Sequence, residues 1–281
     1  MGLNEHFLHL MISLKKDGKL SGRRVVELGA QQLANAFLQD RNSIIHLASL
    51  HGVNADRLPN LPNSGAGIEP GKEPYSRSYY EALGYEYAAI DIDGSPNSIP
   101  IDLNYDNVPP ELLARFDLVT NFGTTEHVSN QLNVFKVIHD LAAPGAVMLH
   151  EVPAQGLINH GFFNYNPKFF QKLAENNAYD TLFLDYRWTE IRPGLPDDVR
   201  SVIERHVSLS GRPLCGISEA VLFVAQRKTS NGPFVPPLDV PTGSLPSDTI
   251  ATRYAPVFKP RLRSLPRRYL RRAVSLLLAG R

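Results

Sequence analysis

Residues 24–30 read Arg24-Val25-Val26-Glu27-Leu28-Gly29-Ala30, and residues 87–93 follow the same plan as Tyr87-Ala88-Ala89-Ile90-Asp91-Ile92-Asp93. Each stretch is a short apolar run that ends at an acidic residue, with glycine close behind. Buried parallel strands have this pattern, and open α/β sheets place ligands at the carboxyl ends of such strands. A carboxylate at one strand end and a glycine turn after another suit a nucleoside-bearing cofactor, because carboxylates accept hydrogen bonds from hydroxyls.

The rest of the chain alternates between apolar runs and amphipathic stretches. Strands are predicted at residues 23–29, 85–92, 99–103, 116–121, 146–152, 181–186 and 220–225. Helical spacing and proline or glycine punctuation predict helices at 5–20, 31–41, 75–83, 109–113, 131–143 and 167–176. This order indicates an α/β fold of the Rossmann-like, doubly wound type: a mostly parallel seven-stranded sheet with helices on both faces. No strong helix separates the last strands, so we expect an antiparallel edge strand.

Two segments of different composition divide the chain. We expect an α/β domain over residues 1–230, followed by a proline-rich linker and a basic amphipathic tail over 231–281. The tail is rich in arginine between 261 and 272. Residues 261–278 suit peripheral contact with an anionic membrane surface, and a solvated terminus or docking on a protein is the alternative.

Composition narrows the class of protein. Of the 281 residues 43% are hydrophobic and 20% charged, which is ordinary for a globular enzyme. A formal net charge of +1 makes nucleic acid an unlikely partner. A single cysteine, Cys215, excludes an internal disulfide and fits the cytoplasm. No apolar run approaches the roughly 20 residues of a transmembrane segment, and the first residues lack the layout of a secretory signal.

The order of features over residues 20–228 resembles a class I S-adenosylmethionine-dependent methyltransferase. Glu27 and Gly29 match the acidic residue and the first glycine of that family's cofactor turn, which continues into Ala30. Gln31 and Leu33 stand where the family has its second and third glycines. The resemblance implies that S-adenosyl-L-methionine is the cofactor and that Glu27, Gly29 and Ala30 lie against it.

The resemblance assigns three further aspartates. Asp91 matches the acidic residue that holds the ribose hydroxyls, a task that suits a carboxylate because it accepts two hydrogen bonds from a vicinal diol. Asp93 is the reserve candidate, and Asp102 stands where the family often contacts the adenine. The alternative is that Asp91 or Asp93 only begins the turn at Asp93-Gly94.

Residues 117–128 look like the family's fourth-strand motif, which opens onto the methyl-donor pocket. This resemblance places Asn121, Phe122 and Gly123 beside the cofactor. Residues 144–151 resemble the helix end and fifth strand that follow in the family. Together these two segments are more specific evidence for the resemblance than the altered glycine turn is.

Histidines downstream of the strand ends are candidates for contact with the methyl acceptor. His127 is the candidate catalytic base, since histidine titrates near neutral pH. His150 and His160 are candidate substrate-binding residues, and Phe162 is a candidate wall of the acceptor pocket. Each could instead pack at the sheet edge. No metal site is predicted, because the histidines show no paired spacing with cysteine or carboxylate.

The function that these features favour is methyl transfer from S-adenosylmethionine to a small-molecule or glycan-like acceptor. A nicotinamide-dependent oxidoreductase fits poorly, because the turn at residues 29–34 lacks two of the three glycines that a dinucleotide requires. A catalytically inactive methyltransferase-like binding or scaffold protein is the remaining alternative. The sequence does not identify the acceptor. The segments that we expect to build its pocket contain no pattern tied to a substrate; they are residues 51–74, 153–166 and 187–217.

Overall fold

The computed structural model describes residues 2–59, 73–95, 98–157, 160–189, 219–240 and 248–254. Its centre is a seven-stranded sheet with the order β3-β2-β1-β4-β5-β7-β6. The strands are β1 Arg24–Leu28, β2 Glu86–Ile90, β3 Ser98–Ile99, β4 Phe116–Phe122, β5 Ala142–Gln155, β6 Tyr179–Thr189 and β7 Glu219–Lys228. β1 to β5 pair in parallel, whereas β7 runs antiparallel to both of its neighbours, β5 and β6. The predicted fold class is confirmed.

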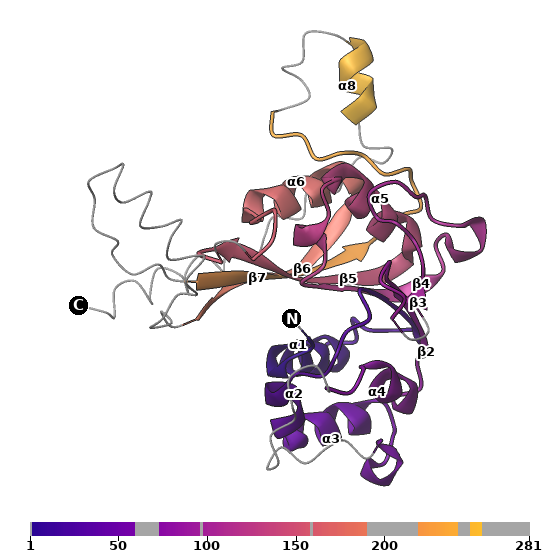
Figure 1. Cartoon of the computed structure of the whole chain (residues 1–281). Coiled ribbons are helices and arrows are strands. Elements are labelled where there is room, and N and C mark those ends of the chain that lie inside the picture. The colour runs from indigo at the N-terminus through magenta and orange to yellow at the C-terminus, as the bar shows by residue number, and fades with distance from the viewer. Residues whose placement is uncertain are drawn as a thin grey trace, which may run out of the picture.

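Helices cover both faces of this sheet (Figure 1). One layer consists of α1 Glu5–Lys16, α2 Asn35–Gln39, α3 Arg41–Leu50 and α4 Arg77–Ala82. The opposite face carries α5 Gln131–Leu141 and α6 Pro167–Asn177, with α8 Asp248–Tyr254 beyond them. Short 3-10 turns follow at η1 Ala55–Arg57, η2 Pro110–Leu112 and η3 Thr125–His127.

Two hydrophobic cores lie on the two sides of the sheet, because successive side chains of a strand point to opposite faces. Val25 and Leu118 pack with the α1–α4 layer, whereas the adjacent Val26 and Val119 pack with α5 and α6. Strands buried on both faces have no polar face of their own. Polar side chains are therefore left to gather where the strands end.

Two predicted elements differ in extent. The predicted helix over 31–41 is replaced by α2 and α3, which separate at Asp40, where the backbone leaves helical geometry and the carboxylate accepts a hydrogen bond from the Ser43 amide to cap α3. The predicted strand over 99–103 is only Ser98–Ile99 in length. Pro100 follows it and has no amide hydrogen to extend a ladder.

The chain beyond the predicted domain boundary at residue 230 continues to pack on the α/β domain. The Gly232 carbonyl lies 2.8 Å from His139 Nε2 of α5, and the Val235 backbone exchanges two 2.8 Å hydrogen bonds with the Asn177 side chain of α6. The basic tail 261–278, the segment 190–217 and residues 60–72 lie outside the described residues. Among the described helices, none is long and apolar enough to cross a membrane.

Candidate active site

The turn after β1 is bound to the end of β2 at the carboxyl edge of the sheet. The Gly29 amide donates to the Ile90 carbonyl at 2.7 Å, and the Ala30 amide donates to Asp91 Oδ2 at 3.0 Å. Asp91 Oδ1 accepts a longer bond, 3.3 Å, from the Asp93 amide. Each oxygen of this half-buried carboxylate has one backbone donor, which leaves further lone pairs for a vicinal diol.

Asp93 and Asp102 use their carboxylates in their own turns. Asp93 Oδ1 accepts from the Ser95 amide at 2.8 Å and from its hydroxyl at 2.6 Å. Asp102 Oδ1 accepts from the Asn104 amide at 2.8 Å. Asp91 is thus the acidic residue that meets the β1 turn. Sequence reasoning missed Ile92 beside it, which is 68% exposed although apolar.

Glu27 is fully buried behind the turn. Its Oε2 accepts three hydrogen bonds, from the Ser76 hydroxyl (2.6 Å), the Tyr87 hydroxyl (2.7 Å) and the Gln31 amide (3.1 Å). Burial raises the pKa of this carboxyl to about 7 despite these donors. Glu27 is fully enclosed and its hydrogen bonds hold the shape of the turn, while its contact with the cofactor stays a prediction.

Glu27→Gln is expected to change the pH dependence of stability. A folded pKa of about 7 exceeds the ordinary value of 4.5, so the folded state binds more protons between these limits and wild-type stability falls as pH rises through them. Glutamine keeps an acceptor for the three donors and does not ionise. As the pH increases across this window, we expect the free energy of unfolding of the variant to rise relative to that of the wild type, by up to about 3 kcal/mol. Urea unfolding at about pH 4.5 and about pH 8 measures the difference.

Glu81→Gln is the matched control, because the Glu81 side chain is exposed on α4 and forms only a surface ion pair with Arg77, 2.7 Å away. The titratable groups that face Glu27 are the hydroxyls of Tyr80 and Tyr87, which burial keeps protonated across the tested range. Parallel stability curves for Glu27→Gln and the wild type would contradict the prediction.

Gln31 makes side-chain hydrogen bonds within the turn, which a glycine at this position could not make. Its side-chain amide donates to the Leu28 carbonyl at 3.3 Å and to the Gly29 carbonyl at 3.4 Å, and it is nearly buried. The residue at the second glycine position thus folds back over the end of β1. The Asp91 carboxylate and the Ala30 amide take no part in this contact, so they remain able to fit the nucleoside part of S-adenosylmethionine.

Thr124 joins the ends of β1 and β4, and sequence reasoning missed it. Its hydroxyl donates to the Leu28 carbonyl at 2.6 Å. A Cβ added to Gly29 would lie 2.8 Å from the same hydroxyl oxygen. The preceding Gly123 has φ +75° and donates its amide to the Glu151 carbonyl of β5. The β1 turn and the segment that begins η3 are therefore in direct contact.

The side chains of three predicted site residues are buried in the interior, and their contact with cofactor or acceptor stays a prediction. Asn121 donates to Thr125 Oγ1 at 2.9 Å and lies 3.2 Å from His150 Nδ1. His150 is enclosed, and burial lowers its pKa to about 3. Phe122 packs edge-on against Phe7 of α1, with ring centroids 5.4 Å apart. Asn121 supports the η3 turn through Thr125, whereas Phe122 belongs to the core beneath α1.

Glu126, His127 and His160 form a cluster on the other side of Thr124. His160 Nε2 lies 3.7 Å from Glu126 Oε1, and the two imidazole rings meet edge-on with centroids 5.1 Å apart. Burial raises the pKa of Glu126 to about 7 and lowers the pKa of both histidines. His127 is exposed and His160 half-buried, so the cluster opens to solvent on the histidine side.

The loop after β5 brings His160 and Phe162 to this cluster. The Phe162 amide donates to the Glu126 carbonyl at 2.8 Å, while its ring is 70% exposed beside the opening. A Cβ on Gly161 would lie 2.9 Å from Glu126 Cγ, so only glycine admits this approach without displacement. Phe162 has the position expected of a pocket wall, and its contact with an acceptor stays a prediction.

The sheet order, the β1 turn and the carboxylate after β2 define a class I S-adenosylmethionine-dependent methyltransferase. Residues 58–205, more than half of the chain, match the family model described as a methyltransferase domain. The chain belongs to this methyltransferase family, and S-adenosylmethionine is its cofactor.

Solved structures similar to the chain include two methyltransferases and the protein TehB. The 1,6-didemethyltoxoflavin-N1-methyltransferase of Burkholderia thailandensis is 13% identical, with 79% of this chain and 78% of that chain covered and a TM-score of 0.41. The O-methyltransferase from a trans-AT PKS multienzyme of Brevibacillus brevis is 12% identical, with coverage of 79% and 71% and a TM-score of 0.38. TehB from Haemophilus influenzae is 11% identical, with coverage of 78% and 62% and a TM-score of 0.44. No curated protein matches the chain.

Proposed function

We propose that the protein transfers the methyl group of S-adenosylmethionine to a small-molecule or glycan-like acceptor that lies against Glu126, His127 and His160. The observation that carries this proposal is the contact of Thr124 with Leu28 and Gly29, because it joins the cofactor turn to the segment that holds the cluster. The methyl donor and the acceptor groups would therefore meet at one edge of the sheet.

Some residues would bind the cofactor, and others would align the acceptor with it. Bound S-adenosylmethionine supplies a methyl group already activated by its sulfonium. Asp91 would accept hydrogen bonds from the ribose hydroxyls. The exposed side chain of Ile92 would pack against the purine. His127 would contact the acceptor from the far side of Thr124. Because the donor is activated, alignment accounts for much of the rate enhancement in such a site.

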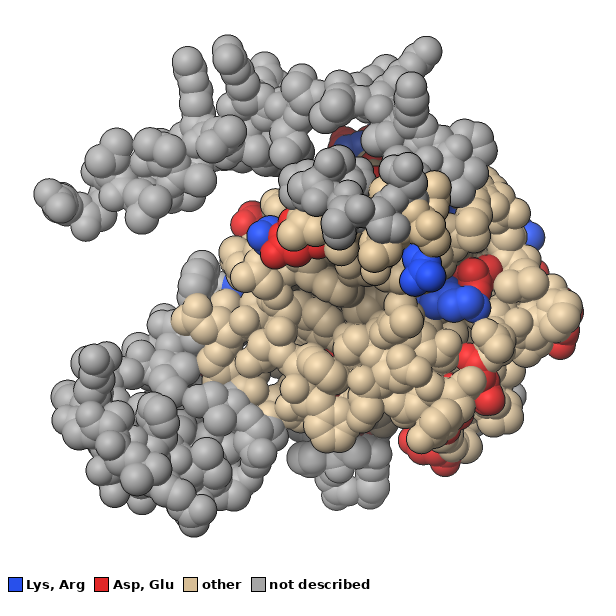
Figure 2. Space-filling model, turned by 90° about the horizontal axis from the view of Figure 1, so that it is seen from above, with Lys and Arg blue, Asp and Glu red and all other residues tan. Residues whose placement is uncertain are grey.

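The surface supports a small acceptor better than a nucleic acid. Figure 2 shows, over the described residues of that face, mostly uncharged surface with acidic and basic side chains mixed at its margins. The formal net charge of +1 agrees with this distribution. A cytoplasmic location and membrane-surface contact through residues 261–278 are parts of the proposal that the sequence alone supports.

A methyl-transfer assay with the full chain tests the proposal. Purified protein, methyl-labelled S-adenosylmethionine and a panel of hydroxylated small molecules and glycans are expected to yield labelled product for one chemical class. His127→Gln is expected to reduce the turnover number by about 100-fold or more, the usual contribution of a positioned catalytic group. Its calorimetric affinity for S-adenosylhomocysteine is expected to stay within about threefold of wild type.

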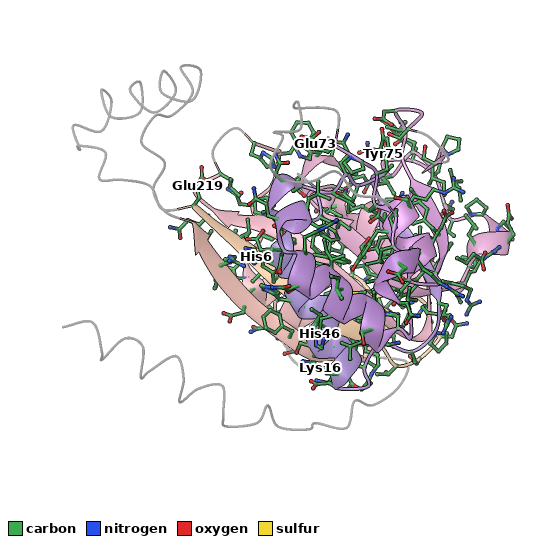
Figure 3. The ribbon with its side chains drawn as sticks, turned by 90° about the horizontal axis from the view of Figure 1, so that it is seen from below. His6, Lys16, His46, Glu73, Tyr75 and Glu219 are labelled. Carbon is green, nitrogen blue, oxygen red and sulfur yellow. The ribbon has the colours of Figure 1, made fainter. Side chains whose placement is uncertain are left out.

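Two results would contradict the proposal. Equal turnover by His127→Gln and the wild type would remove His127 from the acceptor side. Tight binding of S-adenosylhomocysteine without turnover on any acceptor class would favour the binding or scaffold alternative. His46→Gln is the control, since His46 is exposed on α3, in the helical layer opposite α5 and α6 (Figure 3).

A further inference from the structure

Among the described residues, Glu126 is the buried carboxylate of the site that accepts no side-chain or main-chain hydrogen bond from a neighbour. Glu27 Oε2 accepts three hydrogen bonds, and both oxygens of Glu151 accept from Asn4 Nδ2, at 2.9 and 3.1 Å. Neither oxygen of Glu126 accepts a hydrogen bond from the part of the chain that the structure describes, although the side chain is fully buried. A buried carboxylate without a hydrogen-bond donor is costly, so Glu126 suits a ligand that supplies positive charge.

The surroundings of Glu126 identify the kind of group. One carboxylate oxygen of Glu126 and one ring nitrogen each from His127 and His160 lie within 4.8 Å of one another. His160 Nε2 is also buried and without a hydrogen-bond partner, as Glu126 Oε1 is. Two unpartnered ligand atoms from different loops thus face each other across 3.7 Å. Small side-chain movements would bring all three donors to the roughly 2 Å distances of metal coordination.

We propose that Glu126, His127 and His160 bind a zinc-class divalent cation. Two imidazoles and one carboxylate are a common ligand set for catalytic zinc, which retains an open coordination position. Magnesium and calcium are disfavoured, because they prefer sets made of oxygen ligands. Sequence spacing did not predict this site, since His160 is distant along the chain from Glu126 and His127.

The open position would face the acceptor. Glu126 is enclosed, whereas His127 is exposed and the 70% exposed Phe162 stands beside it, so the cation would be reached from the acceptor side. There it would hold an acceptor oxygen, and His127 would serve as a ligand. This role toward the acceptor rests on the proposed function, but cation binding itself does not.

Zinc titration of the full chain, freed of metal by a chelator, tests the site. Competition with a chromophoric chelator is expected to show one tight equivalent in the wild type. Glu126→Gln, His127→Gln and His160→Gln are each expected to lower the zinc affinity by at least about tenfold. Cobalt(II) is expected to give visible absorption bands of nitrogen and oxygen ligation in the wild type, and weaker or shifted bands in the three variants.

His46→Gln is the matched control, an exposed histidine outside the cluster whose loss is expected to leave zinc affinity unchanged. S-adenosylhomocysteine binding, measured in every variant, shows that each is folded and separates this test from failure of the cofactor site. Absence of stoichiometric zinc uptake by the wild type would overturn the proposal. Equal zinc affinity of the wild type and all three variants would also overturn it, because the cation would then lie elsewhere.

Discussion

Asp91→Ala is expected to lower the affinity for S-adenosylmethionine and S-adenosylhomocysteine by about 100-fold or more. The substitution removes both acceptors for the ribose hydroxyls, and hydrogen bonds to a charged group contribute about 1.5–3 kcal/mol each. It also removes the acceptor of the Ala30 amide, which fixes the β1 turn against the end of β2. Calorimetric titration of the full chain with each ligand measures the loss.

Asp93→Ala provides the control, because it removes a carboxylate two residues further along the chain. Asp93 Oδ1 is engaged by Ser95, and its loss is expected to change cofactor affinity by only a few fold. A larger loss for Asp93→Ala than for Asp91→Ala would transfer the ribose contact to Asp93. Unchanged affinity of Asp91→Ala would mean that the cofactor does not lie at the end of β2.

The residues that sequence reasoning placed well are those whose role follows from local chain order. The apolar run before Asp91 ends where β2 ends, so its carboxylate comes to the carboxyl edge. Glu27 lies at the end of β1 as the apolar run predicts, and its hydrogen bonds support the turn that follows. The two-core sheet followed from the same apolar runs, since strands covered on both faces read as continuous hydrophobic segments.

The predicted site residues Asn121, Phe122 and His150 lie within strands, and only Phe122 is beyond the predicted end of its strand. β4 extends through Phe122, and Asn121 and Phe122 pair in register with His150 and Glu151 of β5. Side chains within a ladder covered by helices on both faces are buried whatever their polarity. The exposed edge therefore begins only at Gly123, and the boundary of a strand is not fixed by its local sequence.

The Glu126 cluster could not be predicted, because it depends on the approach of two distant loops. The loop after β5 contacts Glu126 closely because Gly161 has no side chain to keep the two apart. The Glu126-His127 pair was visible after β4, but its partner His160 was not. A tertiary contact made possible by a glycine cannot be recognised from the spacing of residues along the sequence.

Gly29→Ala is expected to damage both the fold and cofactor binding. Gly29 has φ +75°, a region that costs a side chain about 1 kcal/mol or more. The added Cβ would also lie 2.8 Å from Thr124 Oγ1, which is held by its hydrogen bond to the Leu28 carbonyl. We expect a loss of about 2–3 kcal/mol in the free energy of unfolding, and at least a tenfold loss of S-adenosylhomocysteine affinity.

Gly52→Ala separates the two causes, because Gly52 has a similar φ of +73° but open space around its Cβ position. Only backbone strain remains there, so Gly52→Ala is expected to cost about 1 kcal/mol and to leave ligand affinity unchanged. The difference between the two variants measures the contacts of the added Cβ with Thr124 Oγ1 and with Gln31 Nε2, 3.1 Å away. If both variants lost equal stability and Gly29→Ala kept its affinity, the close contact of the two turns would not be required.

A double-mutant cycle with Thr124→Ala identifies the atom responsible. Removing the hydroxyl makes room for the new methyl group, so Gly29→Ala is expected to cost about 1 kcal/mol less in the Thr124→Ala background. Thr124→Ala alone is expected to destabilise, because the Leu28 carbonyl loses its donor. Additive effects would show that strain at Gly29 arises from the backbone alone. Coupling would show that the ends of β1 and β4 act as one unit, as a site shared by cofactor and acceptor requires.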